Sequence, residues 1–369
     1  MNSAPTPIDC LVPRSVTPVP AFAGERSRRD FLRTIGCGAL LASTAGCAGR
    51  ARAPVSAKDS VITVRGPIAA DDLGFTLPHE HVLITHAADP NRNLTDPEAA
   101  VRELALYAAA GGRSLVDMTN IGIKRDPAAL RSISERTGVN IVMGAGYYKD
   151  KWLPPETHRL SVEDMTARIV REIEVGVDDT GIRAGIIGEV GLGRPMTPTE
   201  ERGLRAAARA QRRTRVGISL HFDIGGSLAE HEAALDILVA EGADLKRVAV
   251  GHFLPNPEQI PHFHRIAGRG CFFAFDLFGL EGVIRRKLPP ALEVKCDVIR
   301  QLVAGGLSSH LLLSQDICFK GCLIENGGQG YAHLLRNILP RLEAIGVERS
   351  AIHRITVENP RRLLAIPAL

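Results

Sequence analysis

Short apolar runs alternate with longer amphipathic segments from about residue 61 to the end of the chain. In the longer segments apolar residues recur at i, i+3 and i+4, which predicts helices that include 97–110, 162–175, 199–213 and 228–241. The short runs predict eight strands: 75–84, 114–119, 140–148, 184–192, 217–224, 247–254, 271–280 and 310–317. This alternation predicts an α/β fold, a (β/α)8 barrel of the TIM type. A doubly wound open sheet is the alternative, although no GxGxxG turn follows the first strand.

Helix ends and one long loop refine this plan. Asp96 and Thr199 are residue types that begin helices, and glycine pairs at 111–112 and 305–306 are typical of helix ends. The loop 149–160 carries the only tryptophan of the chain, Trp152. Long loops are often functional, so we expect this one to cover a site at the barrel mouth.

Composition supports one large domain. The chain has 369 residues, which suits a single barrel of roughly 250 residues with extensions, and we place this domain at residues 61–369. The net charge of +4 gives no reason to expect nucleic acid as a partner. The seven cysteines show no CxxC pattern, so neither a disulfide framework nor a zinc finger is expected.

Residues 1–55 have the features of an export signal. Arg28 and Arg29 form a twin-arginine pair, and the apolar run that follows is too short to span a bilayer of about 30 Å. We therefore predict a disordered leader with a twin-arginine signal peptide, recognition by the twin-arginine machinery, and a periplasmic or cell-envelope location. An amphipathic N-terminal helix of a cytosolic protein is the alternative. The stretch "TAGC" also hints at a lipid anchor on Cys47.

Polar residues that can bind metals occur near the C-terminal ends of the predicted strands. His79 and His81 end the first strand, and alternation places them on one face with Glu80 on the other. Glu189 stands in the apolar stretch "AGIIGEVGLG", where an unpaired charge would be costly. The later strands bring three further candidates: His221, His252 and Asp316.

The active site of a barrel lies at the C-terminal ends of its strands, so these six residues should meet there. Imidazole-rich sets favour zinc or another transition metal over magnesium and calcium. Six ligands exceed the three that one catalytic zinc usually takes from protein, and two cations about 4 Å apart would use them all. A carboxylate between two cations would explain the buried charge of Glu189.

The same residues lie in motifs that resemble a known family. The stretch "GFTLPHEH" is followed in order by "IIGEVGLG", "LHFD", "GHF", "SQDICFK" and "VENPRRLL". Over about residues 61–366 the chain resembles the phosphotriesterase family of the amidohydrolase superfamily. It is most similar to the phosphotriesterase-related branch, where a glutamate replaces the carboxylated lysine of the other branches.

The resemblance implies two divalent metal ions, zinc by preference with manganese or cobalt as alternatives. Glu189 would bridge them. The other five ligands would divide between a buried metal and a more exposed one: His79, His81 and Asp316 for the first, and His221 and His252 for the second. An ungapped comparison places the lysine of the other branches nearer Gly188. We therefore expect a local bulge at the glycines that flank Glu189.

The resemblance also implies a reaction. A hydroxide between the metals would attack a lactone, carboxylic ester, amide or phosphoester, with Asp316 as the proton acceptor. Tyr148 resembles a tyrosine of the lactonase branch that lies near the metals and would face the substrate, although Tyr147 competes for this role. Substrate choice would depend on the loops 278–290 and 318–331, where Arg285, Arg286 and Lys287 form a basic run.

Two other functions stay open at this point. A TatD-like deoxyribonuclease shares the barrel and several ligands, but the chain lacks a basic cluster suited to phosphate backbones. A catalytically inactive, exported metal-binding barrel is the second, and the presence of Asp316 argues against it because a binder needs no proton acceptor. The chain could form a homodimer whether it is a phosphotriesterase-like hydrolase or a deoxyribonuclease.

Overall fold

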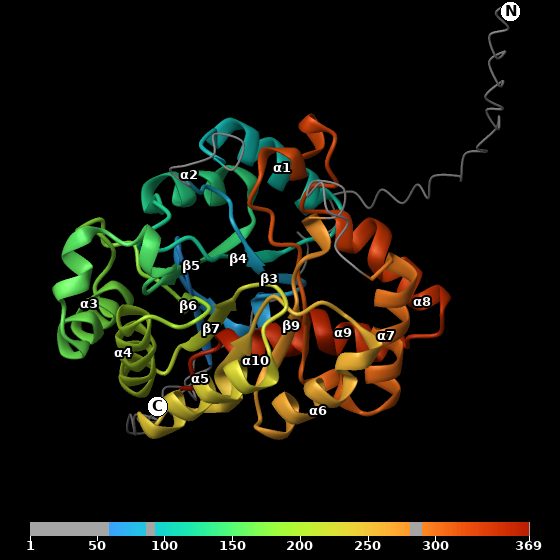
Figure 1. Ribbon diagram of the computed structural model, residues 1–369. Coiled ribbons are helices and arrows are strands. Elements are labelled where there is room, and N and C mark those ends of the chain that lie inside the picture. The colour runs from blue at the N-terminus through green and yellow to red at the C-terminus, as the bar shows by residue number, and fades with distance from the viewer. Residues whose placement is uncertain (1–58, 86–92, 281–289, 369) are drawn as a thin grey trace, which may run out of the picture. The chain divides into compact units, whose positions relative to one another are not determined.

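The structure is a computed structural model that describes residues 59–85, 93–280 and 290–368. Eight parallel strands form one sheet in sequential order from β3 to β10, at the centre of Figure 1. Backbone hydrogen bonds from His81 to Ile317 and from Asp316 to His79 join its two edges. The predicted barrel is therefore confirmed, and the alternative of an open doubly wound sheet is wrong. The strands are β3 Thr76–Glu80, β4 Ser114–Asp117, β5 Asn140–Ala145, β6 Ile186–Leu192, β7 Gly217–Phe222, β8 Val248–Val250, β9 Phe272–Phe275 and β10 Leu311–Leu313.

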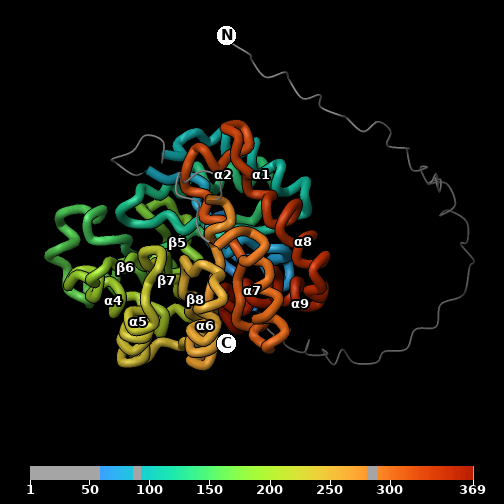
Figure 2. Tube along the Cα trace, turned by 45° about the vertical axis from the view of Figure 1, so that its right-hand side comes forward, coloured from blue at the N-terminus to red at the C-terminus, as the bar shows by residue number. Residues whose placement is uncertain are grey.

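One main helix follows each strand from β3 to β9, and Figure 2 shows α4, α5, α6 and α7 in succession around the strands. Asp96 begins α1 as predicted, because its carboxylate accepts the backbone N–H of Glu98. Thr199 was the wrong choice for α4: Thr197 forms a capping box with Glu200 and the helix begins one residue later. The helices are α1 Pro97–Ala109, α2 Pro127–Thr137, α3 Val162–Glu174, α4 Pro198–Thr214, α5 Leu228–Ala240, α6 Ile260–Gly268, α7 Leu292–Ala304, α8 Leu339–Ala344, α9 Arg349–His353 and α10 Asn359–Leu364.

The sheet separates two apolar cores. The larger core lies between the strands and the surrounding helices, and the smaller one includes Val116, Val142 and Leu312 with Val61 and Leu363. Val61 belongs to a hairpin of β1 Ser60–Thr63 and β2 Gly66–Ala69 that the strand pattern did not predict. Ser60 also pairs with Ile366, so the hairpin and the C-terminal segment join beside the strand starts.

Most predicted strands extend beyond the observed ones at their C-terminal ends. The run 247–254 contains only β8, and the run 271–280 contains only β9. Phe253, Leu277 and Phe278 follow these strands yet are buried, because the loops above the barrel pack against it. Apolar character therefore continues past the last residue of the sheet.

Glu80 joins the two edges of the barrel. Its carboxylate is fully buried and accepts hydrogen bonds from Ser314 Oγ (2.7 Å), Gln315 N (2.9 Å) and Ile317 N (3.0 Å). Burial raises the pKa of Glu80 to about 7, although these hydrogen bonds act in the opposite direction. The side chain of the residue between His79 and His81 therefore holds the segment that carries Asp316.

We expect Glu80→Ala to lower the free energy of unfolding by about 3 kcal/mol or more, because it leaves three buried donors without an acceptor. Urea denaturation of the metal-free protein measures this without a contribution from bound ions. Glu98→Ala, which removes an exposed ion pair with Arg136 at the surface, is the control and should leave the midpoint close to that of the wild type. An equal midpoint for Glu80→Ala would contradict the role of this carboxylate.

Several predictions fall outside the described residues. They are the leader 1–55 with its twin-arginine pair, the lipid anchor at Cys47 and the basic run 285–287. Export to the periplasm or cell envelope therefore stays a prediction. Across residues 59–85, 93–280 and 290–368, every helix is too short or too polar to cross a membrane.

Candidate metal centre

All six predicted ligands converge at the C-terminal ends of the barrel strands. They come from β3, β6 and β7 and from the segments directly after β3, β8 and β10. The donor atoms form two groups in which all atoms lie within 4.8 Å of one another: His79, His81 and Asp316 in one, and Glu189, His221 and His252 in the other. A third group of the same size joins His79 and His252 with Asp276. The first two groups contain the same residues as the predicted buried and more exposed sites, and the assignment of ions to them stays a prediction.

Glu189 lies at the centre of the site with a carboxylate that four imidazoles surround. Its Oε2 is 2.6 Å from His221 Nδ1 and 3.2 Å from His79 Nε2, and its Oε1 is 3.3 Å from His81 Nε2. His252 Nε2 completes the set at 3.7 Å from Oε2. Burial favours the neutral acid, but the facing imidazoles, His221 first, hold the pKa of Glu189 well below its usual range. The side chain is therefore an anion between the two groups.

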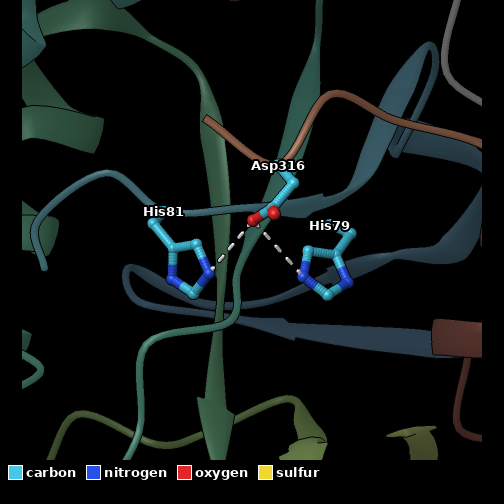
Figure 3. A group of neighbouring side chains, drawn as sticks. All are labelled: His79, His81 and Asp316. Atoms are coloured by element: carbon cyan, nitrogen blue, oxygen red, sulfur yellow. Dashed lines mark ion pairs between the residues drawn. The ribbon is translucent and has the colours of Figure 1, made fainter. Parts of the chain in front are cut away.

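Asp316, which follows β10, faces His79 and His81 (Figure 3). Its Oδ1 lies 3.4 Å from His81 Nε2 and 3.8 Å from His79 Nε2. Burial lowers the pKa of His81, but the Asp316 and Glu189 carboxylates outweigh it and raise that pKa to about 10. The group therefore holds more negative charge than neutral imidazoles can balance, which favours a cation.

The donor set fits a transition metal. His79 Nε2 is buried and makes no hydrogen bond within the described part of the chain, even though it points at two carboxylates. Buried polar atoms normally have partners, so a nitrogen in this position suits a metal ligand. Imidazole nitrogens with two carboxylates are the donors that zinc and its neighbours prefer.

The β6 strand is irregular where it presents Glu189, as expected. Its pairing with β7 shifts register between Ile187 and Val190, and the Gly188–Glu189 peptide bond is cis. The Glu189 N–H donates to Met118 O, and its carbonyl accepts from Asn120 Nδ2 at 2.6 Å. A Cβ atom on Gly188 would lie 2.9 Å from Ser219 Cβ, so a larger residue would not fit without movement. The backbone of Glu189 therefore bonds to the segment that follows β4 through both its N–H and its carbonyl.

Asp276 is an important residue of the site that the sequence reasoning missed. It follows β9, is fully buried, and receives His252 Nδ1 at 3.1 Å and His79 Nδ1 at 3.3 Å. It thus contacts the nitrogens opposite those that face Glu189, and fixes which nitrogen of each ring points inward. An aspartate after an apolar strand was the available signal, but the same pattern is typical of a helix cap.

His81 has a comparable support from β4. Its Nδ1 lies 2.9 Å from Thr119 Oγ1, which in turn donates to Asp117 Oδ1 at 3.2 Å. Asp117 is fully buried, and its Oδ1 also accepts the N–H of Val82 at 2.7 Å. Three of the four imidazoles therefore have a fixed orientation before any ion binds.

Tyr148 reaches the site and Tyr147 does not. The Tyr148 hydroxyl is 3.3 Å from His221 Nε2, on the side of that ring away from Glu189. Burial lowers the pKa of His221 to about 4, so this ring is neutral at physiological pH and can accept from the hydroxyl. Tyr147 instead packs near Gly203 of α4.

A cavity of about 400 Å³ opens above the centre, at the small end of the range for ligand sites. The loop 149–160 lines it as expected, through Lys149, Lys151 and Trp152. The loops after β9 and β10 add four residues that are mostly apolar: Leu277, Leu280, Cys318 and Phe319. The space therefore admits a small molecule beside the candidate ligands.

We expect Asp276→Asn to weaken divalent-ion binding about 10- to 100-fold, because an amide cannot accept from both imidazoles. Calorimetric titration of the metal-free protein with zinc or cobalt measures the affinity. Asp236→Asn removes a comparable charge at the surface, where Asp236 pairs with Arg269, and should bind ions like the wild type. Unchanged affinity in Asp276→Asn would show that His79 and His252 need no such support.

Residues 59–364 match the model of the phosphotriesterase family. An N-acetyltaurine hydrolase from Dictyostelium discoideum is 38% identical over 283 residues, which cover 75% of this chain and 75% of that protein. Among solved structures, a resiniferatoxin-binding protein from Rhodobacter sphaeroides gives a TM-score of 0.76 at 35% identity and covers 84% of this chain and 96% of its own. A mutant of a PTE-like lactonase from Deinococcus radiodurans gives 0.72 at 30% identity, with 82% and 99% covered.

Proposed function

Because this chain belongs to the phosphotriesterase family, a family of metal-dependent hydrolases, we propose that it is a binuclear hydrolase that cleaves small amides. The observation that carries the proposal is the buried Glu189 carboxylate with four imidazoles around it and Asp316 opposite. One cation would be held by His79, His81 and Asp316, and the other by His221 and His252, with Glu189 shared between them. The imidazole-rich set makes zinc the first choice, before manganese and cobalt.

When bound, two such cations would lower the pKa of a water molecule and polarise the substrate carbonyl. The chain itself would handle the protons. Both short contacts of Asp316 use Oδ1, so Oδ2 would accept the proton of the attacking water and pass it to the leaving nitrogen. Its side chain is 11% exposed, against 2% for Glu189, and it lines the cavity. Asp316 is therefore the more accessible of the two carboxylates that face the imidazoles.

Amides rank first as substrates because the similar protein from Dictyostelium discoideum is named an N-acetyltaurine hydrolase. N-acetyltaurine is an acetamide, so its hydrolysis needs a proton donor for the departing amine, which protonated Asp316 would supply. Lactones are the second candidate, supported by the similarity to the PTE-like lactonase. Tyr148, whose hydroxyl lies beside His221, would contact either substrate.

We expect two divalent ions per chain after loading with zinc or manganese, and fewer than two in Glu189→Gln. The amide of glutamine would offer one neutral oxygen in place of an anionic bridge. Elemental analysis of the dialysed protein gives the stoichiometry. The matched variant is Glu172→Gln, a buried glutamate that pairs with Arg125 and does not line the cavity. Two ions retained in Glu189→Gln would sink the bridging role.

Asp316→Asn should lower kcat for N-acetyltaurine about 10²- to 10⁴-fold, because an amide cannot accept the proton. A panel of N-acetyltaurine, a γ-lactone, a phosphotriester and supercoiled plasmid DNA separates hydrolase classes on the metal-loaded wild type. Metal content must be measured in parallel, since Asp316 is also a proposed ligand. Full activity in Asp316→Asn, or turnover of the plasmid alone, would contradict the proposed function.

A further inference from the structure

Two lysines of one loop line the cavity although the proposed chemistry uses neither. Lys149 and Lys151 flank Asp150 at the start of the loop, and Trp152 follows. The carboxylates below them, Glu189 and Asp316, face the imidazoles of the metal site. Neither carboxylate therefore pairs with the lysines, whose ammonium groups can bind another anion.

Lys149 is held at its backbone, at the base of its side chain and at its ammonium. A Cβ atom on Gly191 would lie 2.3 Å from Lys149 N and 2.9 Å from Lys149 Cγ, so the glycine lets the side chain pack directly on β6. Its ammonium pairs with Asp223, which lies two residues after His221. The ammonium is thus fixed on the wall of the cavity, beside the segment that follows His221.

The surroundings of this ion pair are unequal. The Lys149 side chain is 10% exposed, whereas that of Asp223 is 55% exposed. An ammonium has three donors, and within the described residues Asp223 takes one of them. A buried cation with donors to spare favours a second anion, because further charge-assisted hydrogen bonds would offset its loss of hydration.

The backbone of the loop is fixed by a buried acid. Asp150 N donates to Glu200 Oε1 at 3.1 Å, and Glu200 Oε2 accepts from Thr197 N and Gly193 N. Lys151 is the next residue and lies at the rim of the cavity. Its ammonium is 5.3 Å from the centre of the Trp152 ring. Both lysines therefore project from a segment whose position does not depend on a ligand.

We propose that Lys149, with Lys151 at the rim, binds the anionic end of the substrate, so that the preferred substrates are short N-acyl amides of amino sulfonates or amino carboxylates. The inference rests on the proposed function and specifies its substrate class. Lys149 would bind the acid group through the donors that Asp223 leaves. The apolar residues Leu277 and Leu280 are available on the cavity wall for the rest of the molecule.

The first test compares amides of similar size on the metal-loaded wild type: N-acetyltaurine, N-acetyl-β-alanine and the neutral N-propylacetamide. We expect kcat/KM for at least one anion to exceed that of the neutral amide by about 10-fold or more, since a charge-assisted contact is lost with the neutral compound. The better of the two anions identifies sulfonate or carboxylate. Equal values for all three would overturn the proposal and leave the hydrolase itself intact.

The second test uses variants with opposite expected effects. Lys149→Met should raise KM for the preferred anion about 10-fold while the neutral amide changes less than about threefold, and Lys149→Arg should recover part of the loss. Asp223→Asn should lower KM for the anion, because it removes the carboxylate that competes for the same ammonium. Lys246→Met, outside the cavity, is the matched control. An unchanged preference in Lys149→Met, or a raised KM for the anion in Asp223→Asn, would overturn the proposal.

Binding gives a readout that does not depend on turnover. Ethanesulfonate should bind the metal-loaded wild type in calorimetry and bind Lys149→Met about 10-fold more weakly. If the loaded enzyme hydrolysed no amide, ester or lactone, the proposed function would fail, and this comparison would still decide the lysine site. Equal ethanesulfonate affinity in the two proteins would refute it.

Discussion

The seam between β3 and the segment after β10 is where the barrel closes and where the candidate metal site begins. Glu80 spans it, and its Oε2 accepts the N–H of Ile317, 237 residues further along the chain. Because side chains alternate along a strand, Glu80 points into the seam while His79 and His81 point into the barrel. The carboxylate that joins the two edges therefore also sets the distance from these imidazoles to Asp316.

The convergence of the six candidate ligands was predictable from the sequence, and the residues that support them were not. A histidine or glutamate within an apolar run stands out, so His221, His252 and Glu189 could be assigned from one strand each. Asp276 can be recognised only from its contacts with His79 and His252, which lie on other strands. In the sequence it resembles Asp96 and Asp126, which do cap helices. The hydrophobic period of a strand does not show which other strands lie beside it in the fold.

The irregular β6 strand shows how a short side chain can serve as the central anion. A regular strand would keep the Glu189 N–H in the sheet, but here it donates inward to Met118 O. Asn120 then fixes the Glu189 carbonyl at 2.6 Å. The flanking Gly188 was the sequence signal for such a path, because a larger side chain at this position would lie too close to Ser219. From this irregular segment the carboxylate reaches within 3.7 Å of all four imidazoles.

In the loop after β5, two adjacent residues would have different roles: one lies beside the reaction site and the other would select the substrate. Tyr148 contacts His221 and so belongs with the metal site, whereas Lys149 contacts Asp223 on the cavity wall. Both follow a strand of the barrel, and Glu200 holds the next peptide. The separation between the metal site and the ammonium is therefore set by the fold. A substrate with an anionic end must match that separation with the spacer between its amide and its acid group, so the loop would select for length as well as charge.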